Sequence, residues 1–114
     1  MPHVYKIVDS TVWASAIKAG VFKGAAIDLK DGYIHLSSAD QAEETARLHF
    51  AGVANLLLVA FEAAVFGKNL KWEASRGGTL FPHVHASIDP ATALWAKPMP
   101  WNGATHDFPP GWKS

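Results

Sequence analysis

The stretch that decides the fold is Asp31-Gly32-Tyr33-Ile34-His35-Leu36-Ser37-Ser38-Ala39-Asp40-Gln41, because it predicts a turn, a strand and the start of a helix in direct succession. Asp31-Gly32 is a turn signal, and the β-branched and aromatic residues that follow it favour a strand over residues 33–36. Ser38 with Gln41 three residues later fits a capping box, which predicts a helix that begins here and runs to Gly52. The apolar or small residues of that helix are Ala42, Thr45, Ala46 and Phe50.

The segment before this stretch predicts a strand followed by a helix. Val4-Tyr5-Lys6-Ile7-Val8 is a short β-type run, and Asp9 or Ser10 can cap a helix that ends at Gly20. The apolar face of this helix consists of Val12, Trp13, Ala16 and Ile17. Residues 21–30 show no clear period, and we expect a loop there.

The segment after residue 52 predicts strands and irregular chain. The continuously apolar run 56–61 is typical of a strand buried on both faces, and residues 70–73 alternate like a second strand. Residues 76–79 indicate a flexible loop, residues 81–88 and 92–97 resume β character, and Asp89-Pro90 turns between them. We therefore expect one α+β domain over residues 1–114, with a mixed sheet, two main helices in its N-terminal half, and an irregular tail at 98–114.

Composition excludes several classes of function. The chain is 49% hydrophobic and 18% charged, its ten basic residues balance its ten acidic residues, and it has no cysteine. Disulfides and thiolate chemistry are thereby excluded, and no long-range charge draws the chain to nucleic acid, which is disfavoured as a partner without being ruled out. With no signal peptide and no apolar run of membrane-spanning length, we expect a cytoplasmic protein that does not enter the membrane; the oligomeric state stays open.

His35 and Ser37 form the first candidate site. Two residues apart on a strand, they lie on one face, where an imidazole and a hydroxyl can bind a carboxamide, ribose hydroxyls or a phosphate beside a helix N-terminus. The alternative is structural: Ser37 caps the helix and His35 is a satisfied histidine of the fold.

His83 and His85 form the second candidate site, again on one strand face. With His35 and Glu73 they could surround a metal ion, but two histidines at this spacing are a weak metal signal. The favoured interpretation is that one imidazole faces a pocket and the other meets solvent.

The third candidate site consists of Trp72, Glu73 and Arg76. Glu73 beside a histidine can act as a general base or hold the imidazole tautomer, and Arg76 can reach a phosphate. Trp72 can stack on a base or nicotinamide. The alternatives are a surface Glu73–Arg76 ion pair and a core tryptophan, while Arg47 and His49 are expected on the solvated face of their helix.

The chain resembles a small bacterial family known only as domain of unknown function 952. The resemblance spans residues 4 to about 97 and rests on residues 4–7, Trp13, 31–37, Gln41, Thr45, 70–73 and 81–83. It implies an ADP-ribosyltransferase-like fold, which is a split and strongly curved β structure with a cleft for NAD. The His35-Leu36-Ser37 element is also similar to one in RNA 2′-phosphotransferases, which use NAD.

This resemblance implies that His35 contacts the NAD ribose, that Ser37 helps to hold the dinucleotide, and that His83 is a second polar group of the cleft. The chain departs from those families in having only two arginines and, where a late catalytic glutamate is usual, no acidic residue after Glu73 except Asp89 and Asp107. We therefore expect NAD or a related nucleotide as ligand, and an ADP-ribosyl transfer or NAD glycohydrolase-type activity as the possible reaction. The alternatives are a non-catalytic nucleotide- or metabolite-binding module and, less favoured, a histidine-ligated metal hydrolase.

The resulting predicted site has two parts. The predicted catalytic residues are His35, His83 and Glu73. The predicted cofactor-binding residues are His35, Ser37, Gln41, Thr45, Trp72 and Arg76.

Overall fold

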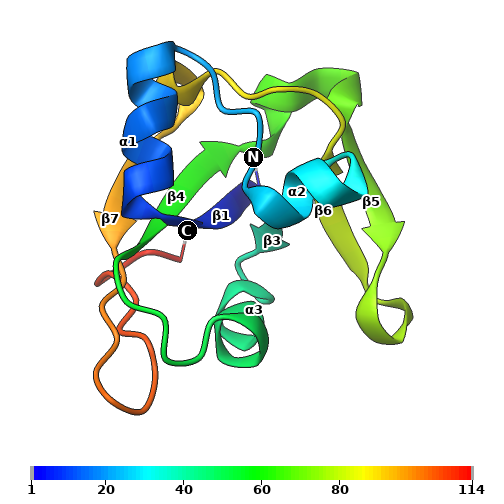
Figure 1. Ribbon diagram of the computed structural model, residues 1–114. Coiled ribbons are helices and arrows are strands. Elements are labelled where there is room, and N and C mark those ends of the chain that lie inside the picture. Colours follow the sequence, from blue (N-terminus) through cyan, green and yellow to red (C-terminus); the bar gives the residue numbers. More distant parts are fainter. Residues whose placement is uncertain (1, 114) are drawn as a thin grey trace.

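The computed structural model describes residues 2–113, apart from the side chain of Arg76, and its strands form two sheets (Figure 1). The four-stranded sheet has the order β3 (Ser37–Ser38), β1 (His3–Asp9), β4 (Leu56–Glu62), β7 (Trp95–Pro98). The three-stranded sheet has the order β2 (Ile34–His35), β6 (Leu80–Val84), β5 (Leu70–Ala74). The helices are α1 (Ser10–Ala19), α2 (Ala26–Asp31), α3 (Ala42–His49) and three short 3-10 segments, η1 (Ala63–Asn69), η2 (Arg76–Gly78) and η3 (Pro90–Thr92).

The α+β class is confirmed, but the expected mixed sheet is wrong. Every strand pairing in the described part of the chain is antiparallel. A parallel neighbour needs a crossover connection of a dozen or more residues, and β5 and β6 are joined by residues 75–79 alone.

The four-stranded sheet separates two hydrophobic clusters because side chains alternate along its central strands. Val4 and Val8 of β1 face the cluster that holds Trp13 of α1, together with Ile34 and Val84 of the three-stranded sheet. Tyr5 and Ile7 face the other cluster, which is completed by α3 and the C-terminal tail through Ala42, Ala46, Met99 and Trp112. In this cluster the Tyr5 and Trp112 rings meet edge to face at 5.1 Å.

Trp13 is expected to be the most costly tryptophan to truncate. Its side chain is 3% exposed and its ring meets those of Phe22 and Phe61 at 5.5 and 6.3 Å. Trp13→Ala should lower the free energy of unfolding by about 3–5 kcal/mol in urea titrations. Trp72→Ala is the matched control, because Trp72 is 44% exposed, and we expect it to cost less than about 1.5 kcal/mol. Equal losses for the two variants would contradict this assignment of the core.

The first helix follows its sequence signals. Asp9 caps it, accepting hydrogen bonds from the amides of Thr11 and Val12 at 2.8 and 3.2 Å, and Gly20 ends it in the left-handed conformation. Its buried face is narrower than predicted, because Ile17 is more than half exposed.

The loop expected at residues 21–30 is present only over residues 21–25, since residues 26–31 form helix α2. The helix has no apolar period because its pattern is inverted: Ile27 and Leu29 are exposed, whereas Asp28 is buried. Helix α3 likewise begins at Ala42 and not at Ser38, because Ser37 and Ser38 first pair with β1 as strand β3. Half of the predicted capping box is present, as the Gln41 side chain accepts a hydrogen bond from the Ser38 amide at 3.0 Å.

Two strand boundaries near the C-terminus also differ from prediction. Strand β6 ends at Val84, and residue 88 returns only as an isolated bridge to Phe22. Strand β7 begins at Trp95, three residues later than expected, because Asp89 accepts a hydrogen bond from the Ala91 amide and starts the 3-10 turn η3. The buried strand expected at 56–61 is confirmed as β4, which pairs with β1 on one side and β7 on the other.

Candidate functional site

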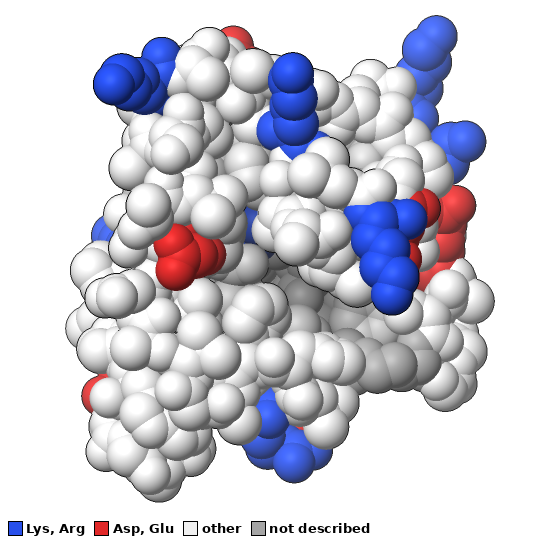
Figure 2. Space-filling model, in the orientation of Figure 1, with Lys and Arg blue, Asp and Glu red and all other residues white. Residues whose placement is uncertain are grey.

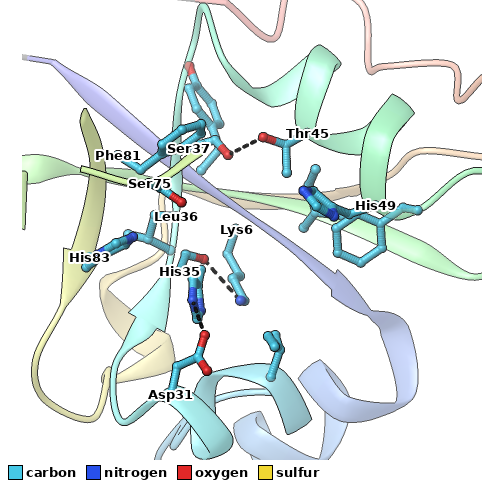
Figure 3. Close-up of a pocket in the computed structure, with 14 residues that line it drawn as sticks. Lys6, Asp31, His35, Leu36, Ser37, Thr45, His49, Ser75, Phe81 and His83 are labelled. Atoms are coloured by element: carbon cyan, nitrogen blue, oxygen red, sulfur yellow. Dashed lines mark hydrogen bonds and ion pairs between the residues drawn. The ribbon is translucent and has the colours of Figure 1, made fainter. Parts of the chain in front are cut away.

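A cavity of 530 Å³ opens where the two sheets diverge (Figure 3). Its volume is in the range of small-molecule sites. It is bounded by β1, α2, α3, β6 and the β2–β3 segment, and the side chains that line it are Tyr5, Lys6, Ile7, Ile27, Asp31, His35, Leu36, Ser37, Thr45, His49, Phe50, Ser75, Phe81 and His83.

The cavity exists because the chain changes sheets at Leu36. On one side of Leu36, His35 pairs with His83 of β6; on the other side, Ser37 pairs with Tyr5 of β1. The Leu36 amide donates to the Pro82 carbonyl at 3.0 Å and so stays with the second sheet. Past Tyr5, strand β1 therefore has no β3 neighbour, and that edge borders the cavity.

His35 is held between two carboxylates. Its Nδ1 lies 2.7 Å from Asp28 Oδ1, and its Nε2 lies 3.0 Å from Asp31 Oδ2. The backbone is fixed as well, because the His35 amide donates to Asp28 Oδ1 at 3.0 Å and its carbonyl accepts from Lys6 Nζ at 3.0 Å. Only a ring protonated on both nitrogens can donate to both carboxylates at once.

Asp28 is the buried centre of this arrangement. Its side chain is fully buried, and Lys6 Nζ lies 2.8 Å from Oδ2 and 3.0 Å from Oδ1. Burial by itself raises the pKa of the Asp28 carboxyl, but the charge of Lys6 and the hydrogen bonds from Lys6 and His35 outweigh burial and leave this pKa below its ordinary value. Asp28 also accepts from the Ala25 amide at 2.8 Å, which begins helix α2.

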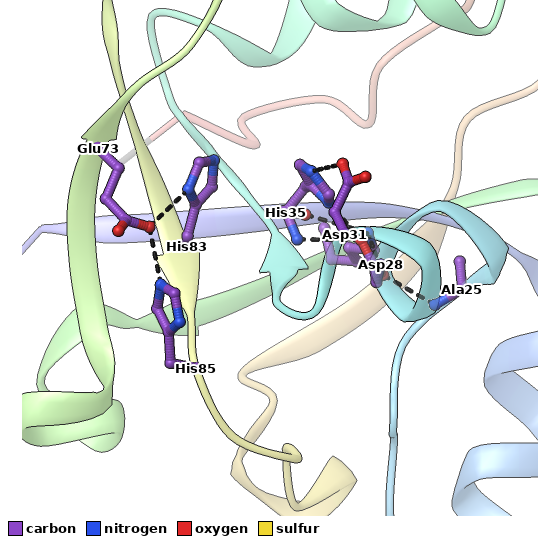
Figure 4. Close-up of polar contacts among 8 residues, drawn as sticks. Ala25, Asp28, Asp31, His35, Glu73, His83 and His85 are labelled. Carbon is purple, nitrogen blue, oxygen red and sulfur yellow. Dashed lines mark hydrogen bonds and ion pairs between the residues drawn. The ribbon is translucent and has the colours of Figure 1, made fainter.

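His83 faces His35 across the antiparallel pair β2–β6, and their ring centroids are 5.3 Å apart (Figure 4). Glu73 Oε1 lies 2.9 Å from His83 Nδ1 and 2.7 Å from His85 Nε2. His83 and His85 thus point to the same side, as predicted, although His85 lies one residue past the end of β6. Glu73 reaches His83 from β5 and orients the ring, which is one of the two roles predicted for it.

The Glu73 carboxyl is expected to titrate below its ordinary pKa of 4.5, because hydrogen bonds from His85 and then from His83 stabilise its charged form. Carbon-detected NMR of the side-chain carboxyl over pH 2–7 measures this titration. In His85→Ala the pKa of Glu73 should move up toward 4.5, and further than in His83→Ala, because His85 makes the larger contribution. An unchanged Glu73 titration in both variants would contradict the contacts.

Tyr33 joins the imidazoles into one aromatic cluster, which sequence reasoning did not identify. Its ring centroid lies 4.7 Å from that of His35, 4.3 Å from that of His83 and 5.2 Å from that of His85. The available signal was the spacing of Tyr33 and His35, which places them on the same face of an extended segment.

The predicted site residues separate into three groups. His35, Ser37, Thr45 and His83 line the cavity, and Ser37 Oγ donates to Thr45 Oγ1 at 3.3 Å. Glu73 lies behind His83, outside the lining. Gln41 and Trp72 do not line the cavity, and the side chain of Arg76 lies outside the described part of the structure.

The structure explains why Gln41 and Trp72 do not line the cavity. Gln41 Nε2 donates to the Leu80 carbonyl at 2.7 Å and so ties the segment before α3 to β6. Trp72 pairs with Pro82, and Glu73 pairs with Phe81; successive strand residues point to opposite faces, so Trp72 cannot share the face of Glu73 and His83.

Four residues that sequence reasoning did not place at the site belong to it: Lys6, Asp28, Asp31 and His49. Lys6 had a signal, namely a charged residue inside a buried β-type run. Asp28 had a weaker one, as an acidic residue four positions before the stop at Gly32. His49 was expected on the solvated face of α3; it is exposed, but it also lines the cavity.

Within residues 2–113 no group of three or more histidine or acidic side chains is arranged to hold a metal ion. His83 and His85 direct nitrogen atoms at Glu73, and both His35 nitrogens meet aspartates. The donor atoms therefore pair with one another and do not converge on a common point.

The surface adds two observations. On the face in Figure 2, basic and acidic side chains are scattered and form no continuous basic patch. The helices in the described range are all too short or too polar to cross a lipid bilayer.

The fold and the site define a small α+β protein with two antiparallel sheets and a histidine-lined cavity between them. The chain belongs to the family described as protein of unknown function (DUF952), whose model matches residues 7–96. It is similar to the crystal structure of protein CC0527 from Caulobacter crescentus, with 42% sequence identity, 93% of each chain covered and a TM-score of 0.88. The solution NMR structure of CC0527 is similar at a TM-score of 0.84 and 42% identity, covering 94% of this chain and 92% of that one. None of the curated proteins matches this chain.

Proposed function

We propose that the cavity is a binding cleft for a nucleotide-type ligand, with NAD as the first candidate. The observation that carries this proposal is the pair His35 and His83, which lie 48 positions apart in the sequence yet face each other at 5.3 Å, each oriented by a carboxylate. Oriented imidazoles beside the hydroxyls of Ser37 and Thr45 suit ribose and carboxamide groups, and the cavity has the size of a small-molecule site.

A relationship to the ADP-ribosyltransferase-like proteins is part of this proposal. Two features support it: the β structure is split into two sheets, and the His35-Leu36-Ser37 element lies at the point of the split. In that arrangement the ribose would lie against the His35 ring, whose two nitrogen atoms are held by Asp28 and Asp31, and Ser37 would hold the dinucleotide, while Glu73 would act through His83.

Binding is tested by NMR titration of ¹⁵N-labelled protein with NAD up to millimolar concentration. We expect shifts at His35, Ser37, Thr45 and His83, and an affinity about tenfold lower in His35→Ala, because the variant loses a ring that lines the cavity and that fixes the Asp31 carboxylate. His3→Ala is the matched control, because His3 is a β1 histidine that does not line the cavity. No shifts at millimolar NAD would contradict the proposal.

Turnover separates an enzyme from a binding module. If the cleft breaks the nicotinamide–ribose bond, free nicotinamide should accumulate in proportion to protein, and His35→Ala and His83→Ala should both abolish its release. Chromatography of NAD incubated with the protein measures this release. Binding with no nicotinamide release would establish the alternative, a non-catalytic nucleotide-binding module.

A further inference from the structure

We infer that Asp31 is the residue by which the cavity recognises a vicinal diol. The ligands of the cavity are then ribosyl compounds, and their nucleoside part is bound without any contribution from phosphate. This inference rests on the proposed function and specifies its chemistry.

The Asp31 carboxylate is oriented before any ligand arrives. Oδ2 is fixed by the His35 ring at 3.0 Å, and the His35 ring is fixed in turn by Asp28 (Figures 3 and 4). Asp31 is also the last residue of α2, which Gly32 ends by donating its amide to the Asp28 carbonyl at 2.8 Å. A carboxylate with one oxygen held and 35% of its side chain exposed has acceptor capacity left for two adjacent hydroxyl donors.

The charge of the lining favours hydroxyl donors over phosphate. The only Lys or Arg side chain among the described lining residues is Lys6, whose side chain is 5% exposed and whose ammonium already contacts Asp28 and the His35 carbonyl. No lysine or arginine in this described lining is therefore free to neutralise a phosphate, whereas the Asp31 carboxylate would repel one. A ribose diol donates its hydrogens to a carboxylate and carries no charge.

An apolar wall next to Asp31 suits the base of a nucleoside. Ile27 lies one helical turn before Asp31 on the same face of α2; it is 51% exposed and lines the cavity. Phe50 and Phe81 also line the cavity. Ile27 thus places an apolar side chain beside the Asp31 carboxylate, where the base attached to a bound ribose can pack.

The test is an NMR titration with adenosine and with nicotinamide riboside, each compared with its 2′-deoxy form, and with AMP. For the nucleoside that binds more tightly, we expect the 2′-deoxy form to bind about tenfold more weakly, because it loses a hydrogen bond to a charged acceptor. In Asp31→Ala this ratio should fall to about twofold or less. AMP should bind no more tightly than adenosine. Asp40→Ala is the matched control, because it removes one exposed aspartate outside the cavity lining and should leave the ratio unchanged.

The outcomes are distinguishable from those of the proposed function. If Asp31 only positioned His35, Asp31→Ala would weaken the ribosyl and 2′-deoxy forms equally and keep their ratio, which would overturn the inference while leaving the cleft intact. AMP binding more than tenfold tighter than adenosine would also overturn it, since phosphate would then be the recognised group. If NAD and both nucleosides all failed to shift any resonance, the proposed function itself would fall.

Discussion

Asp28→Ala is expected to lower the free energy of unfolding by about 3–5 kcal/mol, a large part of the stability of a chain of this size. The substitution leaves the ammonium of Lys6 buried without its counter-ion, and it removes an acceptor from the amides of Ala25 and His35. Breaking a buried pair on one side is costly because the remaining charge is uncompensated. Urea titration followed by circular dichroism measures the loss.

Two comparisons isolate the cause. Asp31→Ala removes an aspartate from the same helix, but its carboxylate is partly exposed, so we expect a loss below about 1 kcal/mol. Adding Lys6→Met to Asp28→Ala removes the unpaired charge and should recover part of the loss. A double variant no more stable than Asp28→Ala would show that the buried charge is not the cause.

The Lys6–Asp28 pair also makes the free energy of unfolding depend on pH, in a direction that the pKa of Asp28 sets. The pKa of Asp28 is below its ordinary value of 3.8 in the folded chain, because Lys6 and His35 stabilise the carboxylate against the opposing effect of burial. The unfolded chain therefore binds a proton at a higher pH than the folded chain does. The contribution of Asp28 is fully present well above pH 3.8, and it is lost as the pH falls through the folded value.

Sequence patterns correctly predicted the helices and strands whose apolar residues are the ones that are buried. β1, α1 and β4 carry apolar residues at positions that face a core, and each formed where expected. Helix α2 was missed because its isoleucine and leucine are exposed and its aspartate is buried, which inverts the pattern that identifies a surface helix. That inversion occurs at the cavity, where Asp28 and Asp31 serve His35 and not a hydrophobic core.

The candidate site was predictable only in part, where its residues follow a local sequence pattern. His35 and Ser37, and likewise His83 and His85, could be placed on common faces by the period of two in a strand. That His35 meets His83 depends on the register of β2 against β6, and that Lys6 meets Asp28 depends on a contact across 22 positions; neither leaves a local pattern. The position of Trp72 could have been predicted from the sequence, because adjacent residues of a strand point to opposite faces and Trp72 is adjacent to Glu73.

Gly24 is the position where a single methyl group is expected to disturb both stability and site. Its φ is +115°, a conformation that side chains rarely adopt, and a Cβ built there would lie 2.7 Å from Asp28 Cβ. Gly24→Ala therefore combines backbone strain with a clash against the residue that orients His35, and we expect the free energy of unfolding to fall by about 2–4 kcal/mol.

Gly52→Ala separates the two effects, because Gly52 also has a positive φ, +80°, but a Cβ there meets nothing within 4 Å. It should cost about 1–2 kcal/mol and leave the His35 and His83 resonances in place, whereas Gly24→Ala should shift them. Equal losses with unmoved histidine resonances in both variants would mean that the packing of Gly24 on Asp28 does not hold the site.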